Sequence, residues 1–185
     1  MAVGISGLIL AGGQGRRMGG VDKGLQPFRG RPLVEHVIER LGPQVDTLLI
    51  SAASTVYAGY GTVVVDELGA GPLAGLHAGL GACPTDLLAS APCDTPLLPT
   101  DLVQRLRDGL KNADAAVARV RTQRHGVCAL VRRALRPRLE AFLKEGGRGV
   151  EAWYATLDTA DVSFDDQPDA FANLNTLDEL RRLES

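Results

Sequence analysis

Apolar runs of strand length alternate with helical repeats along most of the chain, and this alternation constrains the fold more than any other feature. The runs expected to form strands are 7–11, 45–50, 62–65, 86–91, 115–120 and 127–131. Helical spacing of apolar residues occurs over 32–41, 72–80 and 100–110, and a capping box at 176–179 opens a last helix. Because such alternation is typical of βαβ units, the sequence predicts a Rossmann-like, three-layer α/β/α fold with a mostly parallel sheet.

The chain is expected to form one domain over residues 1–185. Its 185 residues are only slightly more than the roughly 150 that usually make one domain. Hydrophobic residues make up 45% of it, so a single core should be stable without a disulfide or structural metal. We find no internal repeat or linker, and the polar, Asp-rich stretch 158–169 is expected to be a surface loop.

The charge balance argues against nucleic acid or an anionic membrane as partner. The chain has 20 Lys and Arg against 22 Asp and Glu, so it has no overall basic field. The apolar stretch 5–11 is far shorter than the 18 or so residues of a membrane span, and it lacks the basic leader of a secretory signal. We therefore expect a cytoplasmic protein that holds any anionic ligand locally.

Cysteines and histidines are too scattered to indicate a disulfide framework or a protein metal cage. They are Cys83, Cys93, Cys128, His36, His77 and His125. We expect reduced thiols, with Cys93 as a packing residue.

The first predicted strand leads directly into a glycine-rich segment, 12–20, that also carries cations. Backbone N–H groups of such a turn can surround phosphate oxygens. The segment is neither a Walker loop nor a good dinucleotide fingerprint, since Met18 stands where that motif has its third glycine. A flexible surface loop would explain the glycines, but it explains Arg16, Arg17 and nearby Lys23 less well. We interpret the segment as an anion cradle.

Polar or small residues follow the carboxyl ends of four predicted strands: Gly12, Ser51, Asp66 and Asp94. Open α/β sheets bind ligands at that edge. Mg²⁺ typically takes one or two carboxylates together with water and substrate phosphates, so the pattern suits a magnesium nucleotide. Asp94, flanked by prolines, is the better metal candidate. Either aspartate could instead be an ordinary turn or strand-end residue.

Several motifs occur in order along the chain: Leu10-Ala11-Gly12-Gly13, Arg17-Met18-Gly19-Gly20-Val21-Asp22-Lys23-Gly24, Gly71-Pro72-Leu73-Ala74-Gly75, Pro92-Cys93-Asp94-Thr95-Pro96, and Asn173-Leu174-Asn175-Thr176 with Glu179. Together they resemble the signature of the molybdenum cofactor guanylyltransferases, the bacterial MobA-type nucleotidyltransferases. The Leu-Ala-Gly-Gly form favours this guanylyl branch, because the cytidylyl branch usually shows Leu-Ala-Ala-Gly.

The resemblance implies transfer of GMP from GTP to the terminal phosphate of molybdenum-molybdopterin, with Mg²⁺ as cofactor and pyrophosphate as second product. An apo molybdoenzyme or another protein of molybdenum cofactor biosynthesis is a further possible partner. A cytidylyl or sugar-1-phosphate nucleotidyltransferase is the alternative enzyme, and a nucleotide-binding molybdopterin carrier is the alternative from another class.

The resemblance also assigns residues. The nucleotide-binding candidates are Leu10, Ala11, Gly12, Gly13, Lys23, Ser51, Asp66, Asp94 and Asn175; the catalytic candidates are Arg17, Lys23 and Asp94, with Asp94 as metal ligand. Ser51 stands where the family usually has Asn, which puts one base or ribose hydrogen bond in doubt. Asn173 and Asn175 could orient phosphate or simply precede the Thr176 cap.

A locally basic stretch remains outside these motifs. Its members are Arg119, Arg121, Arg124, Arg132, Arg133, Arg136 and Arg138. They could hold the acceptor phosphate or meet an acidic partner, but a solvated charged face is the more ordinary interpretation.

Overall fold

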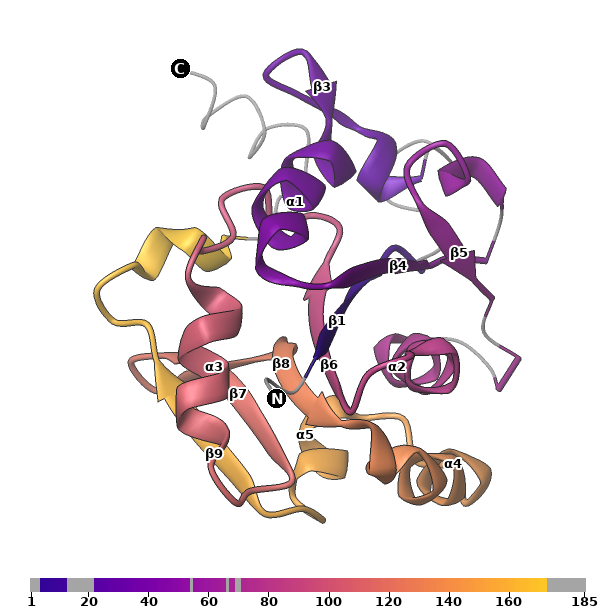
Figure 1. Ribbon diagram of the computed structural model, residues 1–185, viewed down its shortest axis with the longest axis vertical. Helices are drawn as coiled ribbons and strands as arrows, with labels where there is room; N and C mark the ends of the chain where they lie inside the picture. Colours follow the sequence, from indigo (N-terminus) through magenta and orange to yellow (C-terminus); the bar gives the residue numbers. More distant parts are fainter. Residues whose placement is uncertain (1–3, 13–21, 54, 66, 69–70, 173–185) are drawn as a thin grey trace.

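The structure is a computed structural model that describes residues 4–12, 22–53, 55–65, 67–68 and 71–172. Its main feature is a seven-stranded sheet (Figure 1). In spatial order the strands are β5 (Thr62–Val64), β4 (Thr47–Ser51), β1 (Ile5–Leu10), β6 (Leu87–Pro92), β8 (Gln123–Arg132), β7 (Ala115–Val120) and β9 (Thr159–Ser163). The β1–β4, β1–β6, β4–β5 and β7–β9 pairs are parallel, whereas β8 runs antiparallel to β6 and β7. The predicted mostly parallel sheet is confirmed.

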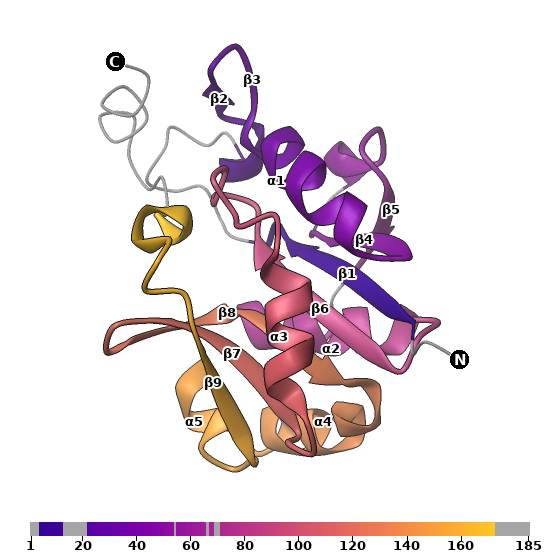
Figure 2. The same cartoon turned by 60° about the vertical axis from the view of Figure 1, so that its left-hand side comes forward.

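Helices cover both faces of the sheet, as Figures 1 and 2 show. α1 (Leu33–Leu41) and α3 (Leu102–Leu110) lie on one face, and α2 (Pro72–Ala82), α4 (Arg136–Lys144) and α5 (Val150–Tyr154) lie on the other. Side chains alternate along a strand, so Ile5 and Ile9 of β1 pack beneath α1 and α3 while Leu8 packs against α2. The three-layer prediction is therefore also confirmed. No helix in the described ranges has both the length and the apolar character of a membrane span.

A short hairpin precedes α1 and was not expected from the sequence. β2 (Pro27–Phe28) pairs antiparallel with β3 (Arg31–Pro32). Arg29 and Gly30 between them have φ values of 50° and 78°, and a two-residue hairpin loop with positive φ at both positions matches the twist of its strands. Strands of two residues are too short to leave an alternating pattern.

The prediction of a surface loop over 158–169 is wrong for its first half, which contains β9. Ala160 and Val162 alternate with polar neighbours and pack against the core beside α3, while Asp161 is exposed. Two small apolar residues among aspartates give a weak strand signal. Burial against α3 and parallel pairing with β7 still make the segment an edge strand.

α2 approaches the sheet closely because glycines face the strands. A Cβ atom at Gly79 would lie 2.5 Å from Cδ2 of Leu8, and one at Gly75 would lie 2.6 Å from Oγ of Ser51. Real Cβ atoms essentially never make such contacts, and Leu8 is fully buried. The two glycines therefore allow α2 to lie close against β1 and β4.

The substitution Gly79→Ala should destabilise the protein relative to Gly81→Ala in the same helix. Both changes gain the helix propensity of alanine, about 1 kcal/mol. At Gly81 the nearest atom is the flexible guanidinium of Arg136, at 3.0 Å. The clash with Leu8 should make the free energy of unfolding of Gly79→Ala about 1–3 kcal/mol lower than that of Gly81→Ala. Urea denaturation measures both values, and equal stability would contradict the close approach.

Candidate functional site

The carboxyl end of β1 lies where the strand order reverses. Leu10, its last residue, pairs with Ser51 of β4 on one side and Pro92 of β6 on the other. Backbone hydrogen bonds continue beyond the strand, from Ala11 N to the Ser51 carbonyl (2.8 Å) and from Cys93 N to the Leu10 carbonyl (3.1 Å). The connection through α1 covers one face and that through α2 covers the other. This topological switch point is where open α/β sheets bind ligands.

The predicted strand-end residues Gly12, Ser51 and Asp94 do lie at this edge. Gly12 is exposed two residues after β1, Ser51 is the last residue of β4, and Asp94 follows β6 in a tight turn. Ala11 and Ser51 are both buried, and the Ser51 hydroxyl lies beneath the first turn of α2. The roles of these residues stay predictions. The other candidates, Gly13, Arg17, Asp66, Asn173 and Asn175, lie outside the described residues.

The structure brings Lys23 and Asp94, distant in sequence, into a direct ion pair between Nζ and Oδ2. The Asp94 side chain is 7% exposed and the Lys23 side chain 28%. A carboxylate this deeply buried needs a partner of opposite charge. The two candidate residues thus form one charged unit that solvent reaches from the lysine side.

Hydrogen bonds on both sides of Lys23 fix the conformation of its backbone. Lys23 opens the short helix η1 (Lys23–Leu25), and the Asp22 carboxylate caps it by accepting from Gly24 N at 3.3 Å. Leu25 N donates to the Asp22 carbonyl at 3.0 Å, and Gln26 N donates to the Lys23 carbonyl at 3.2 Å. The turn therefore presents the lysine side chain in one direction, toward Asp94.

Two buried side chains, Tyr57 and Cys93, lie next to this turn. The sequence did not indicate that they would lie together. Tyr57, at the end of η3 (Thr55–Tyr57), donates its hydroxyl hydrogen to Asp22 Oδ1. Burial, and next the bond to Asp22, raise the pKa of the Tyr57 hydroxyl far above its usual range. Burial, and next the charge of Asp94, likewise raise the pKa of the Cys93 thiol. Tyr57 thus stays a donor and Cys93 stays a neutral packing residue, as predicted for the cysteine.

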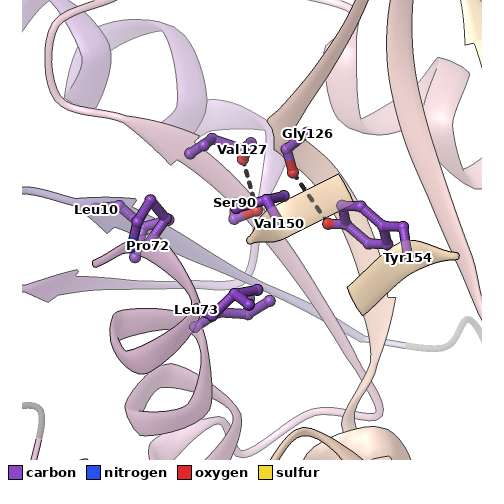
Figure 3. A pocket seen from close by; sticks show the side chains of 9 residues that line it. Leu10, Pro72, Leu73, Ser90, Gly126, Val127, Val150 and Tyr154 are labelled. Carbon is purple, nitrogen blue, oxygen red and sulfur yellow. Dashed lines mark hydrogen bonds between the residues drawn. The ribbon is translucent and has the colours of Figure 1, made fainter. Parts of the chain in front are cut away.

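A separate pocket lies on the α2 side of the sheet, beside the end of β1 (Figure 3). Its lining comes from Leu10, Pro72, Leu73, Leu76, Ser90, Gly126, Val127, Val150 and Tyr154. Its two hydroxyls are used within the protein, because Ser90 Oγ donates to the Val127 carbonyl (2.7 Å) and Tyr154 Oη donates to the Gly126 carbonyl (3.0 Å). Its cavity volume is about 10 Å³, far below the roughly 300–1,000 Å³ of typical ligand cavities. This pocket alone does not accommodate a nucleotide.

The carbonyls of Gly126 and Val127 belong to a bulge in β8 that no sequence pattern indicated. Val117 of β7 pairs with Ala129, but the next residue, Ala118, pairs with His125, so three residues of β8 bulge away from β7. The side chains of Ser90 and Tyr154 replace the missing ladder partners for two of the bulge carbonyls.

Several arginines of the basic stretch bind acceptors of this chain. Arg124 contacts Asp161 at 2.6 Å and Glu151 at 3.3 Å, and Arg138 contacts Asp114 at 3.3 Å. Arg132 donates to the carbonyls of Ala113 and Lys111, both at 2.8 Å. These contacts divide the stretch, so it does not present a single basic face, and they favour a structural use of its charge.

The histidines do not gather into a metal site. His125 stacks on Phe171 with ring centroids 4.7 Å apart, and His36 Nε2 lies 2.8 Å from the Phe28 carbonyl. Among the described residues, no group of three or more histidine, cysteine or acidic side chains is arranged to hold a metal ion.

Comparison with known proteins gives matches over nearly the whole chain. Residues 7–161 match the model of the MobA-like NTP transferase domain. The molybdenum cofactor guanylyltransferase of Ralstonia nicotianae is 48% identical, over 97% of this chain and 95% of that protein. The enzyme of the same name from Shewanella putrefaciens is 46% identical, with the same coverage.

Among solved structures, the molybdopterin-guanine dinucleotide biosynthesis protein A of Archaeoglobus fulgidus superposes with a TM-score of 0.82. It is 25% identical and covers 97% of this chain and 96% of its own. The nucleotidyltransferase type of the fold is thereby confirmed. With this fold and close sequence relatives along its length, the chain belongs to the MobA-like NTP transferase family, together with the molybdenum cofactor guanylyltransferases.

Proposed function

We propose that this protein is a molybdenum cofactor guanylyltransferase, which transfers GMP from GTP to the terminal phosphate of molybdenum-molybdopterin and releases pyrophosphate. The names of its relatives support the substrates. The observation that carries the proposal is the Lys23–Asp94 pair at the carboxyl edge of the sheet, because it places one cation and one carboxylate where a magnesium nucleotide would bind.

The reaction itself requires no protein nucleophile. An oxygen of the acceptor phosphate attacks the α-phosphorus of GTP in line. As that bond forms, the bond from the α-phosphorus to the bridging oxygen breaks, and pyrophosphate leaves with the electron pair. A phosphate monoester is largely ionised near neutral pH, since its second pKa is about 6, so the attacking oxygen needs no general base. The protein contributes positioning and charge stabilisation.

Lys23 supplies positive charge against the pyrophosphate that leaves. Without nucleotide its ammonium group binds Asp94; with nucleotide it turns to the phosphate oxygens, which carry more negative charge. The backbone hydrogen bonds of η1 keep the lysine at this place during the exchange. The exchange of partners leaves the Asp94 carboxylate available for a cation.

Asp94 fits the role of a magnesium ligand. Mg²⁺ usually keeps several waters and takes only one or two protein carboxylates beside substrate phosphates, so one buried aspartate at the strand end suffices. Bound Mg²⁺ would stabilise negative charge on the reacting phosphates. Asp94 holds its carboxylate rigidly, because the turn after β6 is buried together with the neighbouring Thr95.

The proposal also includes a cytoplasmic location and delivery of the product to an apo molybdoenzyme. Three buried cysteines without disulfide partners, Cys83, Cys93 and Cys128, support a reducing compartment. Arg124 and Arg138 pair with acidic residues of this chain, so the basic stretch does not support a large electrostatic surface for docking an acidic partner.

A nucleotide panel tests the substrate. We expect pyrophosphate release with molybdenum-molybdopterin to be fastest with GTP among the four nucleoside triphosphates. Preference for CTP would move the protein to the cytidylyl branch. Binding of GTP without release of pyrophosphate to any acceptor would favour the carrier function.

The substitutions Lys23→Ala and Asp94→Ala should each lower the turnover number at least about a hundredfold to a thousandfold, or roughly 2.7–4 kcal/mol, the usual loss for one charged stabiliser of a transition state. Lys144→Ala is the matched control, because Lys144 is exposed on α4 and pairs with Glu140 four residues away in the same helix. Steady-state kinetics at saturating GTP and Mg²⁺ measure the effect. Either site variant turning over at the control rate would remove its residue from the mechanism.

Chelation tests the metal. Turnover should disappear when EDTA removes divalent cations and return when Mg²⁺ is added. Asp94→Asn should need a higher Mg²⁺ concentration for half-maximal rate, since an amide is a weaker ligand than a carboxylate. Asp108→Asn, on the exposed face of α3, should match the unsubstituted protein. A full rate in EDTA would contradict magnesium dependence.

A further inference from the structure

Tyr57 is a fully buried residue whose hydroxyl reaches the turn that carries Lys23. Its ring packs in the core cluster on the α1 face, and the ring of Tyr60 lies beside it with centroids 6.3 Å apart. A buried hydroxyl usually requires a hydrogen-bond partner. The acceptor here is a carboxylate, which gives the stronger, charge-assisted kind of bond.

We propose that Tyr57 is a positioning residue of the transfer reaction, which fixes the direction of Lys23 by holding Asp22. This inference rests on the proposed guanylyl transfer for its kinetic consequence. The Tyr57 hydroxyl bonds to Asp22, the residue before Lys23, so its effect reaches the lysine through the η1 turn.

The link between Tyr57 and Lys23 begins at one oxygen atom of Asp22. Asp22 Oδ1 accepts both the hydroxyl hydrogen of Tyr57 and the backbone hydrogen of Gly24. Asp22 and Gly24 are the two neighbours of Lys23, so this shared acceptor fixes the chain on both sides of the lysine. Without the Tyr57 hydroxyl, Oδ1 of Asp22 would keep the bond from Gly24 N but lose the bond that ties it to the core.

Asp94, the other member of the ion pair, is linked to the η1 turn through contacts around Gly24. A Cβ atom at Gly24 would lie 2.5 Å from the Tyr57 hydroxyl and 3.2 Å from both Cβ and Sγ of Cys93. Cys93 directly precedes Asp94. Three segments distant in sequence therefore meet around one glycine: the η1 turn with Lys23, η3 with Tyr57, and the end of β6 with Asp94. Their contact determines how Lys23 faces Asp94.

The decisive variant is Tyr57→Phe, which removes one oxygen and keeps the buried ring. We expect kcat/KM for GTP to fall about tenfold to a hundredfold, the scale of a small misplacement of a charged group. In the Lys23→Ala background the same change should cost less than about twofold, within the scatter of independent effects. Tyr60→Phe is the matched control, a half-buried neighbouring tyrosine that should leave kcat/KM unchanged.

A second readout does not depend on catalysis. Hydrogen exchange of the Gly24 and Leu25 amides should become faster in Tyr57→Phe and stay unchanged in Tyr60→Phe. Asp22→Ala removes the acceptor of the same hydrogen bond, so it should also accelerate exchange, and combining it with Tyr57→Phe should add little. These measurements decide the role of Tyr57 in η1 even if the unsubstituted protein transfers no GMP, an outcome that would refute the proposed function alone.

Two results would overturn the inference. One is equal loss from Tyr57→Phe with and without Lys23, which would mean that the tyrosine acts on activity independently of the lysine. The other is unchanged exchange of the Gly24 amide in the variant, which would mean that the hydroxyl does not hold the turn.

Discussion

Parallel pairing of β1 with a strand on each side determines where this chain can perform chemistry. Because β4 and β6 both run in the direction of β1, the three carboxyl ends meet at one edge. Helices α1 and α2 lie on opposite faces of the sheet rather than across that edge. Gly75 and Gly79 then let α2 pack close to the strands. The end of β1 at Leu10 and the turn after Pro92 consequently lie side by side.

At that edge the main electrostatic feature is a carboxylate that burial alone would destabilise. Asp94 is compensated by Lys23, which comes from a turn fixed by its own hydrogen bonds. Tyr57, Asp22 and Gly24 orient this turn from the core side. In the function proposed above, a ligand that combines anionic phosphate with a cation would provide new partners for both members of the pair.

Apolar runs and helical periodicity predicted most strands and the first three helices, because every strand of the sheet except β9 has apolar side chains on both faces. They also placed Gly12, Ser51 and Asp94 at the correct edge. The sequence did not predict elements whose structure depends on tertiary contacts. β9 depends on packing of Ala160 and Val162 against α3. The bulge of β8 depends on hydrogen bonds from Ser90 and Tyr154. Tyr57 carries no motif, because its role comes from a contact with Asp22 far away in sequence. Arg124 likewise finds Asp161 and Glu151 only in the folded chain.

The most direct test of the central claim is a crystal structure of the protein with Mg²⁺ and a GTP analogue that cannot be cleaved between the α- and β-phosphates. We expect the triphosphate to lie at the end of β1, Lys23 Nζ to leave Asp94 for a phosphate oxygen, and the Asp94 carboxylate to bind the metal. A triphosphate bound elsewhere, with the Lys23–Asp94 pair still intact, would show that this pair is not the nucleotide site.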